Sequence, residues 1–494
     1  MKLRKYVPML LMPLVFAATG CDKIDDFGDT NQNPNGASTP SVGALLTNVE
    51  ANYIGDLAAN PRSGLYAQYF SETQYTDASL YATPQLAFSG EFAGGNADAT
   101  GYNGAGLIDL QTIINTNSSN NQTQVARILL QYSFWTITDR WGDIPYSQAL
   151  QGNTTPKFDT QEEVYRGILT TLTDAVAKMD NASPITGDII YNGNVAAWKK
   201  AANSIRMLVA LRMSKVFRGA NDYAATQFKA ALNDPAGYID ENSENMVLRY
   251  PGGNFRNPWY DLYNGRRDYA ESKTMTDLAS NLSDPRQQAF GGRSEDPTSP
   301  DYLQSSNLGV PYGLTRARTE AFTNGNAGWA RILRGDFRLE NSAQVILGAA
   351  HISLARAEAA DYGWTADNLA AVYRLGIEQS FAQWGLPAPS NAYLAQAAVA
   401  VSATPGTGAN LQKIATQRYI AFYPDGIQGW SVWRKTGFPV LTPAPDATNA
   451  TKQIPRRYTY GQSEYGTNNA ATTEAAGRFQ GGDVQDARVW WDRP

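Results

Sequence analysis

The sequence predicts a mainly α-helical protein, in which tetratricopeptide-like helical hairpins form a scaffold and long irregular loops form a binding face. Apolar residues recur at three- and four-residue spacing in several segments of helical length, and short turns join many of these segments in pairs. Loops this long in a compact domain usually carry function. The loops rich in glycine, asparagine, proline and aromatic residues span 71–109, 181–194, 236–269, 283–340 and 437–494.

The first 20 residues are predicted to be a signal peptide. Three basic residues precede the apolar run 6–19, which is shorter than the ~20 residues that a membrane-spanning helix needs. Small residues then lead to Cys21, the only cysteine of the chain, in a pattern typical of a bacterial lipobox. We therefore expect cleavage before Cys21 and attachment there of several acyl chains, palmitate among them, which would anchor the protein stably to a membrane.

Residues 21–44 are predicted to form a lipidated tether followed by turns. Asp22, Asp25 and Asp26 directly follow the cysteine. Such an acidic cluster resembles the surface-export signal of Bacteroidetes lipoproteins, although a simple solvated tether is the alternative. No later linker divides the chain, so residues 45–494 are expected to form a single domain.

The strongest helical pattern covers 195–217, where Arg212 falls on the apolar face. A buried arginine needs an acidic partner, and Glu358, on the apolar stripe of a second predicted helix at 343–360, is a candidate. That helix and a third, which repeats apolar residues from Leu369 to Trp384, should form a hairpin. The other expected helical segments are 122–139 with 160–180, 221–232 after 195–217, and a last stretch at 410–423 continuing into 425–436.

Composition excludes several classes of function. The formal net charge is −5 and no dense basic run occurs, which argues against nucleic-acid binding. One histidine and one cysteine exclude the usual zinc sites, and no cofactor or metal site is predicted. The chain also lacks a nucleophile elbow, a zinc-protease motif and a phosphate-binding P-loop. His351 lies on an apolar helical stripe and is expected to be a core residue.

Two alternatives to a binding protein stay open. An extracellular glycoside hydrolase needs only two suitably spaced carboxylates, which composition cannot exclude. A helical scaffold without any small ligand is the other alternative. A carboxylate pair in an open cleft would favour the hydrolase, and a surface without exposed rings would favour the scaffold.

Aromatic residues are the positive signal for ligand binding. Eight rings fall within 53–92 and five within 255–269, largely outside helical periodicity and beside amide and hydroxyl side chains. Rings of this kind cover the apolar faces of sugars or peptides, and the polar groups orient the ligand. The competing interpretation is that the rings fix the loops onto the core, which is what we expect of Trp430 and Trp433. The predicted ligand-binding residues are Tyr75, Tyr81, Trp259, Tyr260, Tyr312 and Trp329.

Several motifs in order along the chain resemble the SusD/RagB family of outer-membrane nutrient-binding lipoproteins. Gln428 and Lys435 depart from the family pattern, where glutamate and arginine are the expected residues. The segments that carry the resemblance are 27–31 with 33–35, 140–146, 198–203 with Arg212, 355–360, Tyr373 with 376–377, 425–430, 433–437, and 454–458 with Glu464.

The resemblance implies a fold of four tetratricopeptide-like helix pairs. It also implies a lipid-anchored protein of the outer membrane, exposed at the cell surface, that acts as a lid on a TonB-dependent SusC-like transporter. Such a protein captures glycans, or in some members peptides, for import and catalyses no reaction. Ligand-binding residues vary within the family, so the resemblance assigns none in this chain.

Overall fold

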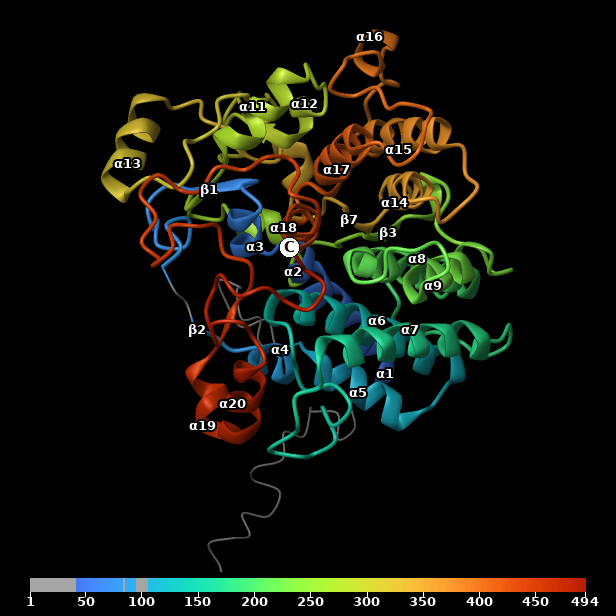
Figure 1. Cartoon of the computed structure of the whole chain (residues 1–494). Helices are drawn as coiled ribbons and strands as arrows, with labels where there is room; N and C mark the ends of the chain where they lie inside the picture. Colours follow the sequence, from blue (N-terminus) through green and yellow to red (C-terminus); the bar gives the residue numbers. More distant parts are fainter. Residues whose placement is uncertain (1–40, 83–84, 95–104) are drawn as a thin grey trace, which may run out of the picture. The chain divides into compact units, whose positions relative to one another are not determined.

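The computed structural model describes residues 41–82, 85–94 and 105–494, and the elements below belong to the unit Val42–Pro494. The predicted lipid anchor, Cys21, and most of the predicted tether lie outside the described residues. The predicted fold class is confirmed, because helices dominate and the strands are short (Figure 1).

Four helix pairs form the scaffold. Within each pair the two helices pack together, and neighbouring pairs are joined by contacts of α7 with α8, α8 with α14, and α14 with α17. The last helix, α18, returns to contact α6. The pairs are α6 (Asn120–Trp141) with α7 (Gln161–Lys178), α8 (Val195–Arg212) with α9 (Tyr223–Leu232), α14 (Ala349–Asp361) with α15 (Leu369–Gln383), and α17 (Gly408–Phe422) with α18 (Gly426–Thr436).

Two of the predicted helical segments are divided in the structure. The segment 343–360 begins as strand β7 (Gln344–Leu347), and its helix starts only after Gly348. The stretch 410–436 is two helices, because Pro424 lacks a backbone N–H and Tyr423 before it is extended. It is also not the last helical stretch, since α19 (Gln462–Thr467) and α20 (Asn469–Gly477) follow.

Close packing of the hairpin α14–α15 depends on Gly376. A Cβ atom at this position would lie 2.7 Å from Cγ of Leu354 on α14. A larger side chain would therefore push the two helices apart.

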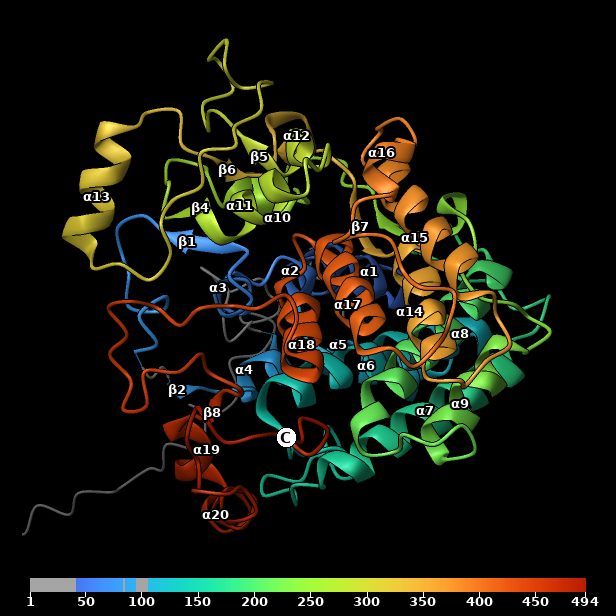
Figure 2. The ribbon, with the colours of Figure 1, turned by 45° about the horizontal axis from the view of Figure 1, so that its top comes forward.

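The remaining elements are short helices and strands (Figure 2). Some of them form an irregular region, and the others pack around the scaffold. The described residues contain four two-stranded sheets. Three of them are antiparallel and pair β1 (Phe70–Glu72) with β4 (Tyr269–Glu271), β3 (Met246–Leu248) with β7, and β5 (Gly291–Gly292) with β6 (Arg331–Ile332). The fourth pairs β2 (Gln85–Leu86) with β8 (Thr459–Tyr460) in parallel. The shorter helices of the irregular region are α10 (Pro258–Asp261), α11 (Lys273–Asn281), α12 (Gln287–Phe290), α13 (Arg316–Gly325) and the 3₁₀ helix η5 (Gly335–Arg338). The others are α1 (Val42–Asn48), the π-helix η2 (Val49–Ile54), α2 (Gly55–Ala58), α3 (Pro61–Tyr66), α4 (Ser89–Ala93), α5 (Leu107–Thr116), η3 (Met213–Lys215), η4 (Asn242–Glu244) and α16 (Asn391–Leu394).

The predicted burial of Arg212 with an acidic partner is confirmed. Its side chain is 3% exposed, and its Nη1 lies 3.5 Å from Oδ2 of Asp139 on α6. Its Nη2 donates a 2.7 Å hydrogen bond to Oε1 of Gln428. The charge of Arg212 is thus already balanced by Asp139, and Gln428 adds an uncharged hydrogen-bond acceptor. This accounts for a glutamine at position 428.

Glu358 is also buried, but its partner is not Arg212. Its carboxylate accepts hydrogen bonds from Arg418 and Lys435, and a 2.6 Å bond from the hydroxyl of Tyr362. Burial opposes ionisation, yet Lys435 and Arg418 lower the pKa of Glu358 to about 2. Lys435 is therefore a buried partner of this carboxylate.

His351 is a core residue, as predicted. The backbone N–H of Gly348 donates to its Nδ1 at 3.1 Å, so the ring proton lies on Nε2, which donates to the carbonyl of Ala421 at 3.0 Å. Burial lowers the pKa of His351 to about 4, so the ring is neutral at physiological pH. Trp430 is fully buried and Trp433 partly buried against the core, also as expected.

Candidate functional site

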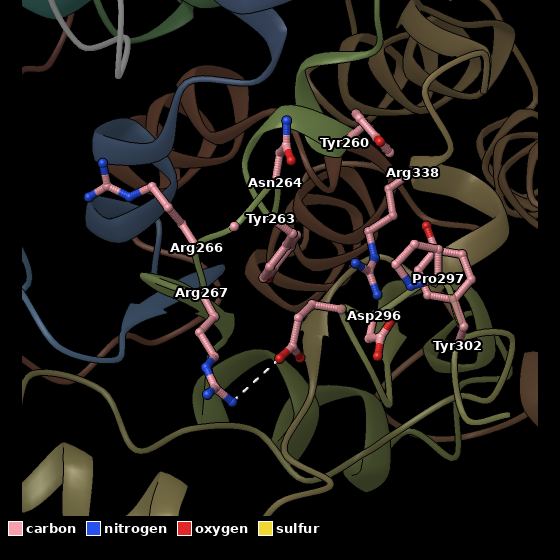
Figure 3. A pocket seen from close by; sticks show the side chains of 11 residues that line it. Tyr260, Tyr263, Asn264, Arg266, Arg267, Asp296, Pro297, Tyr302 and Arg338 are labelled. Carbon is pink, nitrogen blue, oxygen red and sulfur yellow. Dashed lines mark hydrogen bonds and ion pairs between the residues drawn. The ribbon is translucent and has the colours of Figure 1, made fainter. Parts of the chain in front are cut away.

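A pocket of about 340 Å³ opens on the irregular region, and we call it the tyrosine pocket (Figure 3). Side chains reach it from α10 and the turn that follows, from the loop between β5 and β6, and from η5. Its wall consists of Tyr260, Tyr263, Asn264, Gly265, Arg266, Arg267, Glu295, Asp296, Pro297, Tyr302 and Arg338.

The short helix α10 places Tyr260 at this pocket. Asn257 caps the helix by accepting a 2.8 Å hydrogen bond from the N–H of Trp259, and Pro258 occupies the first helical position. Successive helical side chains point about 100° apart, so Trp259 turns into the core while Tyr260 stays half-exposed. The guanidinium of Arg256 lies 5.7 Å from the centre of the Tyr260 ring.

The buried part of the pocket is an arginine between two tyrosine rings (Figure 3). The guanidinium of Arg338 lies 4.7 Å from the ring centre of Tyr263 and 5.0 Å from that of Tyr302. It donates to the carbonyls of Leu333 and Ser294, which fix its orientation. The tyrosine pocket thus offers a rigid aromatic and cationic surface.

Ion pairs hold the rim of the pocket. Arg267 lies 3.4 Å from Glu295, the contact drawn as a dashed line in Figure 3. Glu295 also accepts a 2.6 Å hydrogen bond from Nε of Arg331. Arg266 donates to Asp268 at 2.7 Å. These polar groups can orient a hydroxylated ligand without leaving a large unbalanced charge.

A second pocket of about 370 Å³ adjoins the first, because Arg267 lines both. It lies against α13 and has mostly polar walls. Two adjoining pockets provide a surface longer than one sugar ring or one amino acid. The other lining residues of the second pocket are Thr73, Gln74, Glu320, Thr323, Asn324 and Trp329.

Comparison with known proteins identifies the family. The family model SusD-like, described as "Starch-binding associating with outer membrane", matches residues 34–461. The chain belongs to this SusD-like family. A search of curated proteins found no match.

Solved structures of SusD homologues share the fold. A chitin-binding protein is 25% identical to this SusD-like chain, with a TM-score of 0.73, over 92% of this chain and 100% of the other. A chitin-binding SusD homologue from Flavobacterium johnsoniae is 22% identical, with a TM-score of 0.76, over 91% and 98%. A SusD homologue from Bacteroides uniformis is 23% identical, with a TM-score of 0.73, over 92% and 99%.

Of the six predicted ligand-binding residues, Tyr75 is exposed and Tyr260 is half-buried. Tyr260 lines the tyrosine pocket, whereas Tyr75 is 56% exposed and lies outside both pockets, 5.5 Å from the guanidinium of Arg316 on α13. The SusD-like chain therefore presents these two rings at different places.

The structure buries the other four predicted rings. Tyr81 is fully buried and its hydroxyl accepts a 2.9 Å hydrogen bond from the N–H of Ala444, while Tyr312 packs against it at 6.4 Å. Trp259 is 2% exposed. Trp329 is also 2% exposed, and the Arg331 guanidinium covers one face at 3.7 Å. The structure thus buries all four of these rings, although Trp329 also lines the second pocket.

Sequence reasoning missed Tyr263, Tyr302, Arg267 and Arg338 as pocket residues. Tyr263 belongs to the aromatic run 255–269, but its place in that run does not reveal which rings face the surface. Arg338 lies 75 residues after Tyr263 in the chain, and only the tertiary fold brings it between two tyrosines.

The tyrosine pocket contains two acidic residues, Glu295 and Asp296. Glu295 is held by Arg267 and Arg331. Hydrogen bonds from Thr298 lower the pKa of Asp296, which is opposite to the raised pKa typical of a glycosidase general acid. The described residues, 41–82, 85–94 and 105–494, contain no group of three or more metal-ligating side chains. Over the same ranges, no helix has the length and hydropathy needed to cross a membrane.

Proposed function

We propose that this SusD-like protein is a non-catalytic lipoprotein of the cell surface that captures oligosaccharides and delivers them to a TonB-dependent SusC-like transporter. The observation that carries the proposal is the tyrosine pocket, an open site with a rigid floor of two tyrosines and Arg338. The adjoining pocket across Arg267 suits a chain of several sugar rings better than a single ring.

The family and the similar structures support the same class of ligand. The family description names starch binding and association with the outer membrane, and two structures of the same fold are described as chitin-binding. Attachment through Cys21 would place the protein on the outer membrane without a spanning helix. A peptide is the alternative ligand, and a binding assay with both classes of ligand distinguishes the two.

Binding is tested by calorimetry with starch and chitin fragments of three to six sugars and with short peptides. The variant is Tyr260→Ala, and the matched control is Tyr238→Ala. Both tyrosines are half-exposed with an arginine close to the ring, at 5.7 Å for Tyr260 and 5.4 Å for Tyr238, but Tyr238 lies outside both pockets.

We expect Tyr260→Ala to weaken the best oligosaccharide at least tenfold, which is about 1.4 kcal/mol, and Tyr238→Ala to leave its affinity unchanged. Equal affinity of the Tyr260 variant and the parent would exclude the tyrosine pocket as the binding site. Binding of peptides alone would replace the ligand class, and turnover of the oligosaccharide would replace the non-catalytic function with that of a hydrolase. If no oligosaccharide or peptide binds, the protein is a scaffold rather than a capture protein.

A further inference from the structure

Tyr75 is the one aromatic residue among the exposed large apolar side chains of the described residues. It lies in the loop after β1, with 56% of its surface exposed, and lines neither the tyrosine pocket nor the second pocket. Single exposed apolar side chains are common on protein surfaces, so exposure alone assigns no role to this ring. Its neighbours connect it to the second pocket.

The loop that carries this ring is fixed at its start and across its turn. The hydroxyl of Thr73 donates to the carbonyl of Arg267, and its backbone N–H donates to that of Asp268 at 2.8 Å. The carboxylate of Glu72 accepts hydrogen bonds from the N–H and the hydroxyl of Ser79 at 2.8 and 2.9 Å. Because the loop is already ordered, a ligand that packs on its ring has little ordering cost to overcome.

One face of the helix α13 forms a wall of the second pocket. Glu320, Thr323 and Asn324 line the pocket, and their spacing places them on the same side of the helix. Arg316 lies one turn before Glu320 on this side, and its Nε donates to the Glu320 carboxylate at 2.7 Å. From residue 316 to residue 324 this face extends over about 12 Å, at a rise of about 1.5 Å per residue. It is therefore longer than one sugar ring.

Arg316 also connects the pocket wall to the exposed ring. Its guanidinium lies 5.5 Å from the centre of the Tyr75 ring, while its Nε bonds to Glu320 on the pocket wall. Gln74, which directly precedes Tyr75 in the chain, lines the same pocket. The loop after β1 lies beside α13 in both views of the molecule (Figures 1 and 2). The exposed ring therefore adjoins the second pocket.

A continuous path of surface follows from these shared residues. Arg267 lines both the tyrosine pocket and the second pocket. Gln74 and Glu320 then join the second pocket to the ring of Tyr75. The path runs from the half-buried ring of Tyr260 through both pockets to a second, more exposed tyrosine ring.

The side chains between the two rings suit a hydroxylated chain. Both charged residues of the second pocket are paired, Arg267 with Glu295 and Glu320 with the first turn of α13. The second pocket therefore carries little net charge. Hydroxyl and amide groups line it and can orient sugar hydroxyls, while a tyrosine ring covers the apolar face of a sugar. These groups belong to Gln74, Thr323 and Asn324.

We propose that the ring of Tyr75 and the adjoining face of α13 form a third subsite, which makes the protein select long oligosaccharides over short ones. The proposal rests on the proposed function, because it extends the same binding surface. A short chain is enclosed better by the two pockets than by an open ring, so only a longer chain reaches Tyr75.

Calorimetry on the full chain with a length series tests this subsite. The ligands are starch and chitin fragments of two to eight sugars. The variant is Tyr75→Ala, and Tyr75→Phe is the conservative variant that keeps the ring. Tyr238→Ala is the matched control, because its ring also has an arginine close by, at 5.4 Å, but lines neither pocket. Since Tyr75 is exposed, its replacement should leave the melting temperature of the protein unchanged.

We expect the affinity of the parent protein to rise with chain length and then to level off. Tyr75→Ala should bind the longest chains about fivefold more weakly, a change within the range that one aromatic contact contributes. It should bind the shortest chains as the parent does. Tyr75→Phe and Tyr238→Ala should match the parent at every length, whereas Tyr260→Ala should weaken all lengths.

Two results would overturn the third subsite. Equal affinity of Tyr75→Ala and the parent at every length would show that the ring is only a partner of Arg316. An equal loss at every length, the two-sugar fragment included, would place Tyr75 in the first site that a chain occupies and remove the selection by length.

These outcomes are distinct from a failure of the proposed function. An unchanged Tyr75→Ala beside a weakened Tyr260→Ala refutes the third subsite alone and leaves capture by the tyrosine pocket in place. A length-dependent loss in Tyr75→Ala with an unchanged Tyr260→Ala would move the binding site to α13 and refute the tyrosine pocket instead. Absence of binding to any oligosaccharide would overturn both proposals.

Discussion

Substitution of Glu358 by glutamine tests whether buried charge organises the scaffold. Glu358 is fully buried and links α14 to α17 through Arg418 and to α18 through Lys435. The two cations are only 3% and 2% exposed. A glutamine keeps the shape of the side chain but removes the negative charge. Lys435 can respond by losing its proton, whereas Arg418 cannot, so a buried positive charge would be left without its partner.

Breaking a buried pair in this way costs about 3–5 kcal/mol of unfolding free energy. Unfolding entropy is about 2.1 cal/mol/K per residue, or about 1 kcal/mol/K for the roughly 450 residues of the unit Val42–Pro494. The expected fall in melting temperature is therefore about 3–5 °C. Differential scanning calorimetry at pH 7 measures it, and urea unfolding measures the free energy.

The matched control is Glu378→Gln on α15, where the carboxylate pairs with Arg374 one turn away at the surface. An exposed pair of this kind contributes about 0.3–0.5 kcal/mol, so the control should change the melting temperature by less than 1 °C. The pKa of Glu358 is lowered to about 2 in the folded protein, so its contribution is present above about pH 4.5 and is lost as the pH falls toward 2. A loss of less than about 1 kcal/mol in Glu358→Gln at pH 7 would refute the reasoning.

Two further predictions concern Glu271 and Cys21. Glu271 is fully buried and only Gln287 donates to its carboxylate among the described residues, so burial raises its pKa well above the usual value. The folded protein then binds this proton more tightly than the unfolded chain, and stability falls as the pH rises above about 4.5. Glu271→Gln should therefore be more stable than the parent in urea unfolding at pH 8 and close to it at pH 4.5; equal stability at both values would contradict the argument. Cys21→Ala should no longer fractionate with membranes, and unchanged fractionation would exclude lipid attachment at this residue.

The sequence by itself determined the helical scaffold and part of its interior. Apolar spacing located the helix pairs, because a helix that packs on neighbours must carry an apolar face wherever its partners lie. The same spacing placed Arg212, His351 and Glu358 inside the protein, since residues on that face are buried whatever their polarity. The sequence also located the last two helices on either side of Pro424, because a proline lacks the backbone N–H that a continuous helix needs, but the cap of the second helix at Asp425 is seen only in the structure.

Tertiary structure decided which charges meet and which rings reach the surface. Helical periodicity shows which face of a helix a residue occupies, but not which residue of another helix it contacts. Glu358 pairs with Arg418 and Lys435, and Arg212 pairs with Asp139. Outside the long helices, no regular spacing relates one ring to the next. Trp259 and Tyr260 are adjacent in sequence, yet Trp259 is buried in the core and Tyr260 lines the tyrosine pocket. The tyrosine pocket exists only because the fold brings Arg338 between the rings of Tyr263 and Tyr302, and contacts between such distant segments leave no local pattern in the chain.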